Sequence, residues 1–157
     1  MNKKNLEQTA LKLLDSMYSL VHCFTESETE VCRKRKITNA ESRIINSINP
    51  DDENYVNTIA ETLQLSKSRI SRLVSSLKRK GLIAKKENDL DHRFNIISLT
   101  VKGAEIKQQL FQDKLDRCMD TLSFISSEIH SDLITKLSVL KKAYDQYKEE
   151  ASKAKSK

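Results

Sequence analysis

Apolar residues at the start of the chain recur at alternating steps of four and three. Over residues 6 to about 25 they occupy Ala10, Leu14, Met17, Val21 and Phe24. This heptad-like stripe is typical of a helix that packs along another helix over several turns. We therefore predict a first helix over this segment. Acidic residues and the basic run 33–36 then interrupt the pattern, and we expect a frayed helix end and a loop there.

A second helix is indicated by its first residues. Thr38 and Glu41 stand three positions apart in TNAE, the spacing of a capping box, in which each side chain accepts a hydrogen bond from the other residue's backbone N–H. We expect this helix to run through Ile48. The residues Asn49 and Pro50 should stop it.

Two closely spaced helices are expected next, over about 55–63 and over 66–80. The small residue Ala60 lies where the second helix would cross the first, and a larger side chain there would hold the helix axes apart. This arrangement predicts a helix-turn-helix motif. Gln64 replaces the glycine that is usual in the turn. We expect either a strained backbone at Gln64 or a turn of different construction.

The segments LIAKKEN and FNIISLT follow the motif, on either side of the turn-like NDLDHR. Both are short, apolar and rich in β-branched residues, which predicts a β-hairpin. A helix-turn-helix followed directly by a hairpin is a winged helix. The sequence therefore predicts a winged helix-turn-helix domain over residues 38–100.

Two further helices are predicted after the hairpin. Thr100 should cap the first of them, and Ser126 or Ser127 should open the second. Their apolar stripes again step four and three, at Phe111, Leu115, Cys118 and Leu122 and at Leu133, Leu137, Leu140, Tyr144 and Tyr147.

A monomer of this size has too little other surface for three such stripes to cover. We therefore expect the terminal helices to pair with a second copy of the chain around a twofold axis. The predicted fold is mainly α-helical with a small β-hairpin wing. Residues 1–37 and 101–150 would form the dimerisation helices, and residues 151–157 a disordered basic tail.

Charge is unevenly distributed along the chain. The whole sequence has 28 Lys and Arg, 22 Asp and Glu, and a formal net charge of +6. Residues 66–93 alone account for this excess, and residues 66–81 contain no carboxylate at all. A solvated surface helix normally mixes both signs along its exposed side. We therefore expect the predicted helix 66–80 to face phosphate, which nucleic acid and acidic membrane surfaces both present.

Positions within this helix suggest different roles. Its first turns carry Ser66, Lys67, Ser68, Arg69, Ser71 and Arg72. Side chains and free backbone N–H groups there can meet bases and phosphates, and Arg69 or Arg72 is the candidate for base reading. Lys78, Arg79 and Lys80 lie at the far end, where we expect phosphate contacts.

Other functional classes find little support. No apolar run approaches the length that spans a bilayer, and the start of the chain lacks the apolar part of a secretion signal. Together with three cysteines in no metal-type spacing, this predicts a cytoplasmic protein without a membrane partner. We find no phosphate-binding glycine loop, nucleophile elbow or histidine-rich metal motif, and we expect no catalytic residues, metal or cofactor.

The segments IAETLQLSKSRISRLVSSLKRKGLI and DHRFNIISLTVKG together resemble the MarR family of transcription regulators. The likeness is most specific over residues 59–103. It implies that the helix 66–80 lies in the major groove, that Arg93 of the wing reaches into the minor groove, and that Asp91 orients Arg93. Gln64 in the turn and His92 in the wing depart from the family pattern.

Two functions remain open from the sequence. The first is a homodimeric, sequence-specific regulator of transcription, more often a repressor than an activator, on a pseudo-palindromic site in double-stranded DNA. A small-molecule effector or a redox signal would modulate its DNA affinity. Cys23 is a candidate thiol sensor, and a buried inert cysteine is the alternative. The second function is a non-sequence-specific nucleoid or adaptor protein.

Overall fold

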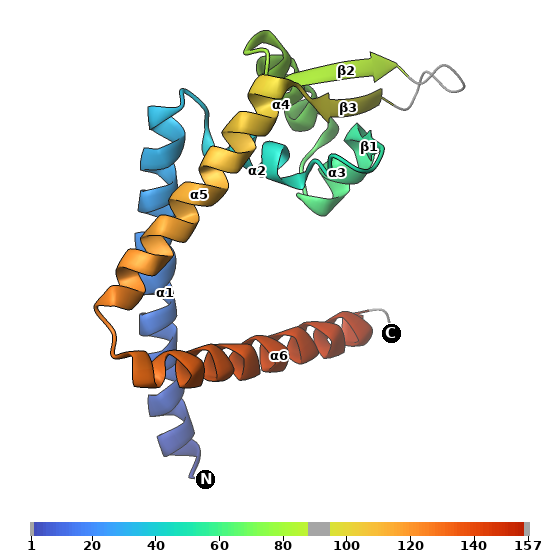
Figure 1. The fold of residues 1–157 in the computed structure, drawn as a ribbon. Coiled ribbons are helices and arrows are strands. Elements are labelled where there is room, and N and C mark those ends of the chain that lie inside the picture. The colour runs from blue at the N-terminus through green and yellow to red at the C-terminus, as the bar shows by residue number, and fades with distance from the viewer. Residues whose placement is uncertain (1, 88–94, 156–157) are drawn as a thin grey trace. The chain divides into compact units, whose positions relative to one another are not determined.

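The computed structural model describes residues 2–87 and 95–155 of the chain (Figure 1). Within these ranges the elements follow in the order α1 (Lys3–Lys34), α2 (Asn39–Ser47), β1 (Asn54–Tyr55), α3 (Val56–Thr62), α4 (Lys67–Arg79), β2 (Ile83–Glu87), β3 (Asn95–Leu99), α5 (Val101–Ser123), the 3₁₀ turn η1 (Ser127–Ile129) and α6 (His130–Lys155). Helices dominate and the strands form one small antiparallel sheet. The predicted winged-helix fold class is therefore confirmed. None of these described helices is both long and apolar enough to cross a membrane.

The chain divides into two compact units, Met1–Asp113 and Lys114–Lys157. The first contains α1 to β3 and the beginning of α5, and the second contains the rest of α5 and α6. All buried apolar side chains among the described residues lie between Cys32 and Leu110, in the first unit. The hydrophobic core is therefore that of the winged helix together with Cys32 of α1 and Leu110 of α5.

This core is built where the short helices turn their apolar sides inward. The capping box predicted for α2 is present, because Thr38 Oγ1 accepts from Glu41 N and Glu41 Oε2 accepts from Thr38 N. The most deeply buried apolar side chains come from α2, α4, β3 and α5 and from the residue that ends α2: Ile44, Ile45, Ile48, Leu77, Ile97 and Leu110.

The sheet has the strand order β1-β3-β2 with both pairings antiparallel. β2 and β3 are the strands of the predicted hairpin, and Ile83 lies opposite Leu99 at its base. The two-residue strand β1 pairs with Ile96 and Ile97 of β3 and was not predicted. Two residues are too few to show the alternation by which a strand is recognised.

α1 is longer than the sequence analysis predicted, and the expected loop after residue 25 was wrong. The helix continues to Lys34 because residues 26–34 contain neither glycine nor proline, and the acidic cluster interrupts the apolar stripe without interrupting the backbone. A 3.1 Å ion pair between Lys34 and Glu30, one turn apart, supports the last turn. The chain then reverses at Lys36, whose φ is 56°.

The second correction concerns the end of the chain. α6 runs to Lys155, so the described residues after Glu150 are helical, not disordered as predicted. Alanine and lysine, which dominate this segment, are among the residues with the highest helix propensity. The predicted opening of the last helical segment at Ser126 or Ser127 is confirmed, because the 3₁₀ turn η1 starts at Ser127 and leads into α6.

Candidate nucleic-acid interface

The helix α4 is held in the winged helix by one apolar side. Ile70, Val74 and Leu77 are at most 4% exposed and follow the helical spacing of four and three. Ser66 caps the helix, since its hydroxyl accepts a hydrogen bond from Arg69 N at 3.3 Å. The buried side fixes which residues of α4 face outward.

The turn between α3 and α4 explains how the two helices approach each other. Leu65 N donates to Ala60 O at 2.8 Å, and Ala60 is buried at the crossing as predicted. Gln64 has a φ of 54°, in the left-handed region that glycine adopts most easily. Of the two expectations for this turn, the strained backbone at Gln64 is the one observed.

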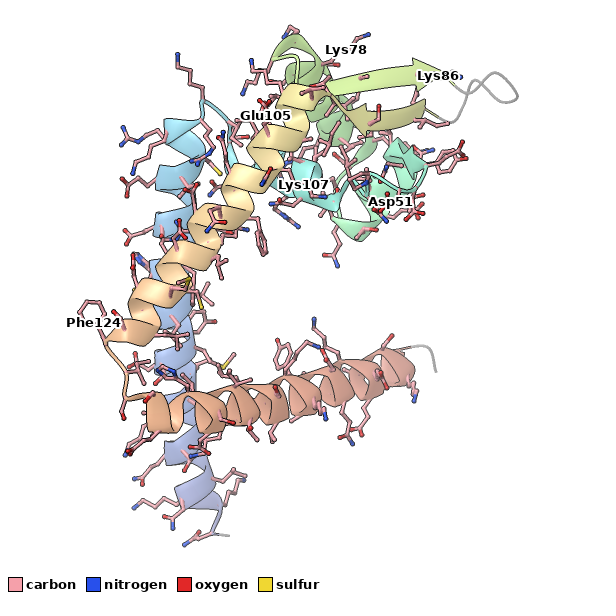
Figure 2. The ribbon with its side chains drawn as sticks, in the orientation of Figure 1. Asp51, Lys78, Lys86, Glu105, Lys107 and Phe124 are labelled. Carbon is pink, nitrogen blue, oxygen red and sulfur yellow. The ribbon has the colours of Figure 1, made fainter. Side chains whose placement is uncertain are left out.

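The outward side of α4 is basic and hydroxylated, as the sequence predicted. Its exposed residues include Ser66, Lys67, Ser68, Arg69, Ser71, Arg72, Lys78 and Arg79. No ion pair within the described ranges neutralises Lys67, Arg69, Arg72, Lys78 or Arg79. Figure 2 shows Lys78 on this helix and Lys86 on β2. The structure therefore gathers one sign of charge on a single exposed helix face.

The N-terminal end of α4 adds a backbone contribution to this charge. The first turn contains no acidic residue. The Ser66 hydroxyl satisfies the N–H of Arg69, while the N–H groups of Lys67 and Ser68 precede the first intrahelical bond. A helix N-terminus with free N–H groups favours an anion such as phosphate.

Lys80, at the C-terminal end of α4, differs from its two neighbours. Its ammonium donates to Glu41 Oε2 at 2.7 Å and to the carbonyl oxygen of Lys36 at 2.9 Å. Lys80 was expected from the sequence to contact phosphate, together with Lys78 and Arg79. The structure turns its charge toward the protein instead.

Glu41 is the buried partner of this lysine and is only 2% exposed. Besides Lys80 it accepts from Thr38 N and from the Ser76 hydroxyl, each at 2.7 Å. Burial raises the pKa of the Glu41 carboxyl, but the hydrogen bonds and the positive charge of Lys80 lower it by more, so the pKa lies below its ordinary value. Sequence reasoning found Glu41 only as a helix cap, because its partners on α4 are 35 and 39 residues away.

The base of the wing is joined to both α4 and α5. Thr100 Oγ1 donates to Gly81 O at 2.7 Å and accepts from Gly103 N at 3.0 Å. A Cβ on Gly103 would lie 1.9 Å from the Leu82 carbonyl oxygen, so only glycine fits there. Exposed Lys85 extends the basic surface onto β2.

The predicted wing contacts, Asp91 and Arg93, lie outside the described residues, as does His92. Their expected contact with the minor groove stays a prediction.

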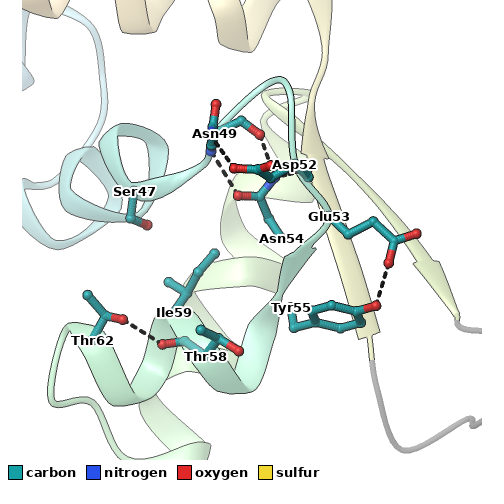
Figure 3. A pocket seen from close by; sticks show the side chains of 9 residues that line it. All are labelled: Ser47, Asn49, Asp52, Glu53, Asn54, Tyr55, Thr58, Ile59 and Thr62. Atoms are coloured by element: carbon teal, nitrogen blue, oxygen red, sulfur yellow. Dashed lines mark hydrogen bonds between the residues drawn. The ribbon is translucent and has the colours of Figure 1, made fainter.

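A small pocket of about 250 Å³ lies between the end of α2, β1 and α3 (Figure 3). Its polar groups bond one another: Asn54 Nδ2 donates to Asn49 O at 2.7 Å, and Tyr55 OH donates to Glu53. The hydrogen bond to Glu53 raises the pKa of Tyr55. These hydrogen bonds shape the loop before β1, which explains why polar groups line the pocket. The pocket was not predicted from the sequence.

The three cysteines occupy different environments. Cys32 is buried in the core, whereas Cys23 and Cys118 are exposed. Cys23 follows Ser19 by four residues, which places it on the polar side of α1, away from the apolar stripe. Cys23 is therefore not buried in the single chain, and its role as a thiol sensor stays a prediction.

The apolar stripes outside the winged helix are exposed in the single chain. On α1 the exposed fraction is 50% for Leu14, 59% for Val21 and 69% for Phe24. The stripes of α5 and α6 are exposed too, among them Phe111, Leu115, Leu133, Leu137, Tyr144 and Tyr147. Contiguous apolar faces of this kind are unusual on a monomeric protein surface.

Known proteins share part of this sequence and the whole fold. A sequence model of the MarR family matches residues 36–93. Among solved structures, YusO from Bacillus subtilis has a TM-score of 0.75 and 23% identity, covering 87% of this chain and 97% of its own. The MarR family transcription regulator SP03579 has a TM-score of 0.75 and 20% identity, covering 94% of this chain and 99% of its own. A mutant of S. aureus MepR, solved bound to an oligodeoxyribonucleotide, has a TM-score of 0.63 and 25% identity, covering 85% and 97%. No curated protein sequence matches.

The matched residues contain α2, α3, α4, the turn at Gln64 and β2, which are the elements that form the basic face and its support. The family is one of transcription regulators, which supports at that level the expectation that the chain is not an enzyme. The resemblance drawn from the sequence motifs is thus confirmed: residues 36–93 match the MarR family model, and the whole fold matches solved structures of MarR-type regulators.

Proposed function

We propose that this chain is a sequence-specific, DNA-binding regulator of transcription that acts in the cytoplasm as a homodimer. The observation that carries the proposal is the exposed face of α4, which is basic, free of carboxylates and unpaired within the described ranges. Such a face matches the charge of a DNA backbone, and the helix that bears it is narrow enough for the major groove. The oligonucleotide-bound MepR mutant supports the same use of the fold.

Within α4 we assign sequence reading to the first turns and affinity to the far end. Arg69 and Arg72 can each bond guanine through two N–H groups, which would contribute about 1 to 3 kcal/mol of discrimination per base. Exposed Lys78 and Arg79 would contact phosphates without regard to sequence. Asp91 and Arg93 would add a minor-groove contact from the wing.

The homodimer is supported by the exposed stripes of α1, α5 and α6, which a second copy would cover. A twofold protein with two copies of α4 binds a pseudo-palindromic operator, with half-sites about one helical turn apart. We expect repression through occupancy of such an operator. A small-molecule effector would relieve it by binding preferentially to a state that does not fit the DNA, and oxidation of exposed Cys23 is the corresponding redox route.

Gel-shift titration against the DNA upstream of the chain's own gene tests the proposal. We expect one retarded complex that excess competitor DNA does not dissociate. Substituting bases of one half-site should abolish binding. Nearly equal affinity for all substituted sites would instead favour the non-sequence-specific nucleoid or adaptor function.

A further inference from the structure

The contact between Glu41 and α4 links parts of the winged helix that are far apart in sequence. Glu41 stands in the first turn of α2, and its two carboxylate oxygens bond Ser76 in α4 and Lys80 at the end of α4, both at 2.7 Å. Ser76 and Lys80 are four residues apart and therefore lie on the same side of the helix. Glu41 thus holds α4 at two points along its axis.

Lys80 is tied to further segments in addition to Glu41. Its ammonium donates to Lys36 O, in the turn that joins α1 to α2, and its own carbonyl oxygen accepts from Lys102 Nζ of α5 at 3.3 Å. The end of α4 is therefore bonded to three surrounding segments within the first unit.

Apolar packing alone leaves the position of a helix loosely determined. Burial of Ile70, Val74 and Leu77 is favourable over a range of small rotations and shifts, because the hydrophobic effect has no direction. Hydrogen bonds to a buried carboxylate require specific distances and angles. A displaced α4 would keep most of its apolar contact but would leave Glu41 buried without its partners.

We propose that Glu41 and Lys80 are positioning residues for DNA binding, which fix the position and rotation of α4 so that its exposed side chains meet the bases in register. The inference rests on the proposed function. Under this proposal Lys80 is not a phosphate contact. Glu41, although buried, contributes to DNA binding by positioning α4.

A double substitution tests positioning apart from stability. In the Glu41→Met and Lys80→Met double variant both charges are replaced by apolar groups, an exchange that often leaves stability unchanged. We expect cooperative folding to persist while operator affinity falls roughly tenfold, corresponding to the loss of about one base contact. Affinity for scrambled DNA should change little, so the ratio of specific to non-specific binding falls.

The salt dependence of binding separates positioning from direct contact. Loss of one phosphate contact lowers the slope of log affinity against log salt by about 0.9. We expect this decrease for Lys78→Met, the exposed comparison on the same helix, and no decrease for Lys80→Met or the double variant. An unchanged specificity ratio in the double variant, or a slope decrease for Lys80→Met equal to that of Lys78→Met, would overturn the proposal.

Two smaller changes cover the case in which the double variant does not fold. Ser76→Ala removes one bond to Glu41, whereas Ser75→Ala makes the same change at an exposed neighbour. We expect only Ser76→Ala to lower the specificity ratio, and equal ratios for the two would contradict the inference. If the wild-type chain shows no sequence preference at all, the proposed function fails. The salt slope of Lys80→Met on any duplex still decides the role of Lys80.

Discussion

Three residues in the described part of the chain adopt the left-handed backbone region, and each follows a helix. They are Lys36 after α1, Gln64 after α3 and Gly81 after α4. Only Gly81 has the residue type that this conformation favours. At Lys36 the carbonyl oxygen accepts a hydrogen bond from Lys80, which helps to hold this conformation. The Gln64 side chain, in contrast, is exposed to solvent. Strain at the turn of the helix-turn-helix motif is therefore open to correction by a single substitution.

We expect Gln64→Gly to stabilise the chain by about 0.5 to 1 kcal/mol. Removing the Cβ relieves a left-handed strain of about 1 to 2 kcal/mol, and the greater freedom of glycine in the unfolded chain offsets part of the gain, about 0.4 to 1 kcal/mol. Urea unfolding measures the difference. Gln64→Ala is the control and should show no gain, because alanine keeps the Cβ. A less stable glycine variant would mean that the Gln64 side chain contributes contacts of its own.

Glu41 makes the stability of the domain depend on pH. Because the pKa of Glu41 is lowered in the folded state, its contribution is present above the unfolded pKa and is lost as pH falls through the folded pKa. Wild-type stability should therefore fall in acid, below about pH 4.5. Glu41→Gln should lose about 2 kcal/mol at neutral pH, where the charged hydrogen bonds are complete, and show a smaller loss in acid. Urea titrations at several pH values check this, and parallel curves for the two proteins would exclude Glu41 as the source.

At the scale of elements, the parts marked by local chemistry were predictable. Thr38 and Glu41 indicated the start of α2, and Ser66 indicated the start of α4. The apolar runs predicted the hairpin. Helix caps and strand patterns are recognisable in the sequence because they depend on a few neighbouring residues. The length of α1 was missed because an interrupted apolar stripe says nothing about backbone continuity. The strand β1 was missed because two residues carry no period.

The candidate site also contains residues that the sequence predicted and a pairing that it did not. The apolar stripe of α4 alone predicted that Arg69, Arg72 and Lys78 would be exposed, because none of them falls on its buried side. The pairing of Lys80 with Glu41 depends on how α2 and α4 pack, and no sequence pattern near either residue contains that information.

The junction of β2 and α5 gives a prediction about packing. Gly103→Ala should destabilise the domain by about 1 to 3 kcal/mol, because the new Cβ would collide with the backbone of Leu82. In an ordinary helix the same change is favourable by about 1 kcal/mol. Gly81→Ala is the comparison: no atom lies within 4 Å of its added Cβ, so only backbone strain of about 1 to 2 kcal/mol applies. Thermal unfolding of both variants measures the difference, and a Gly103→Ala protein as stable as wild type would contradict this account of the junction.

The wing provides a prediction for DNA binding. Arg93→Ala should weaken operator binding, because an arginine in the narrow minor groove contributes electrostatic attraction. The oligomeric state should not change, since the stripes expected to form the dimer lie elsewhere. Gel shift measures the first effect and sedimentation the second. Unchanged DNA affinity would remove the wing from the mechanism.

On the scale of the whole molecule, apolar burial and exposure are separated along the chain. Buried apolar side chains in the described residues occur only between Cys32 and Leu110, while the stripes before and after that segment are exposed. The winged helix can thus form its core from one chain. The terminal helices leave their stripes exposed in the single chain, and we expect their stability to depend on a second copy that covers these stripes.

Met17→Glu tests that dependence. Met17 lies on the apolar stripe of α1 and is 38% exposed in the single chain, so its burial by a second copy would place a charge in an apolar interface. We expect sedimentation to shift from dimer to monomer and helicity by circular dichroism to fall. Ser19→Glu adds the same charge on the polar side of α1 and should leave the dimer intact. Operator affinity should fall steeply only for Met17→Glu, because one copy of α4 then binds a single half-site without its partner. A Met17→Glu protein that stays dimeric would place the subunit interface away from this stripe.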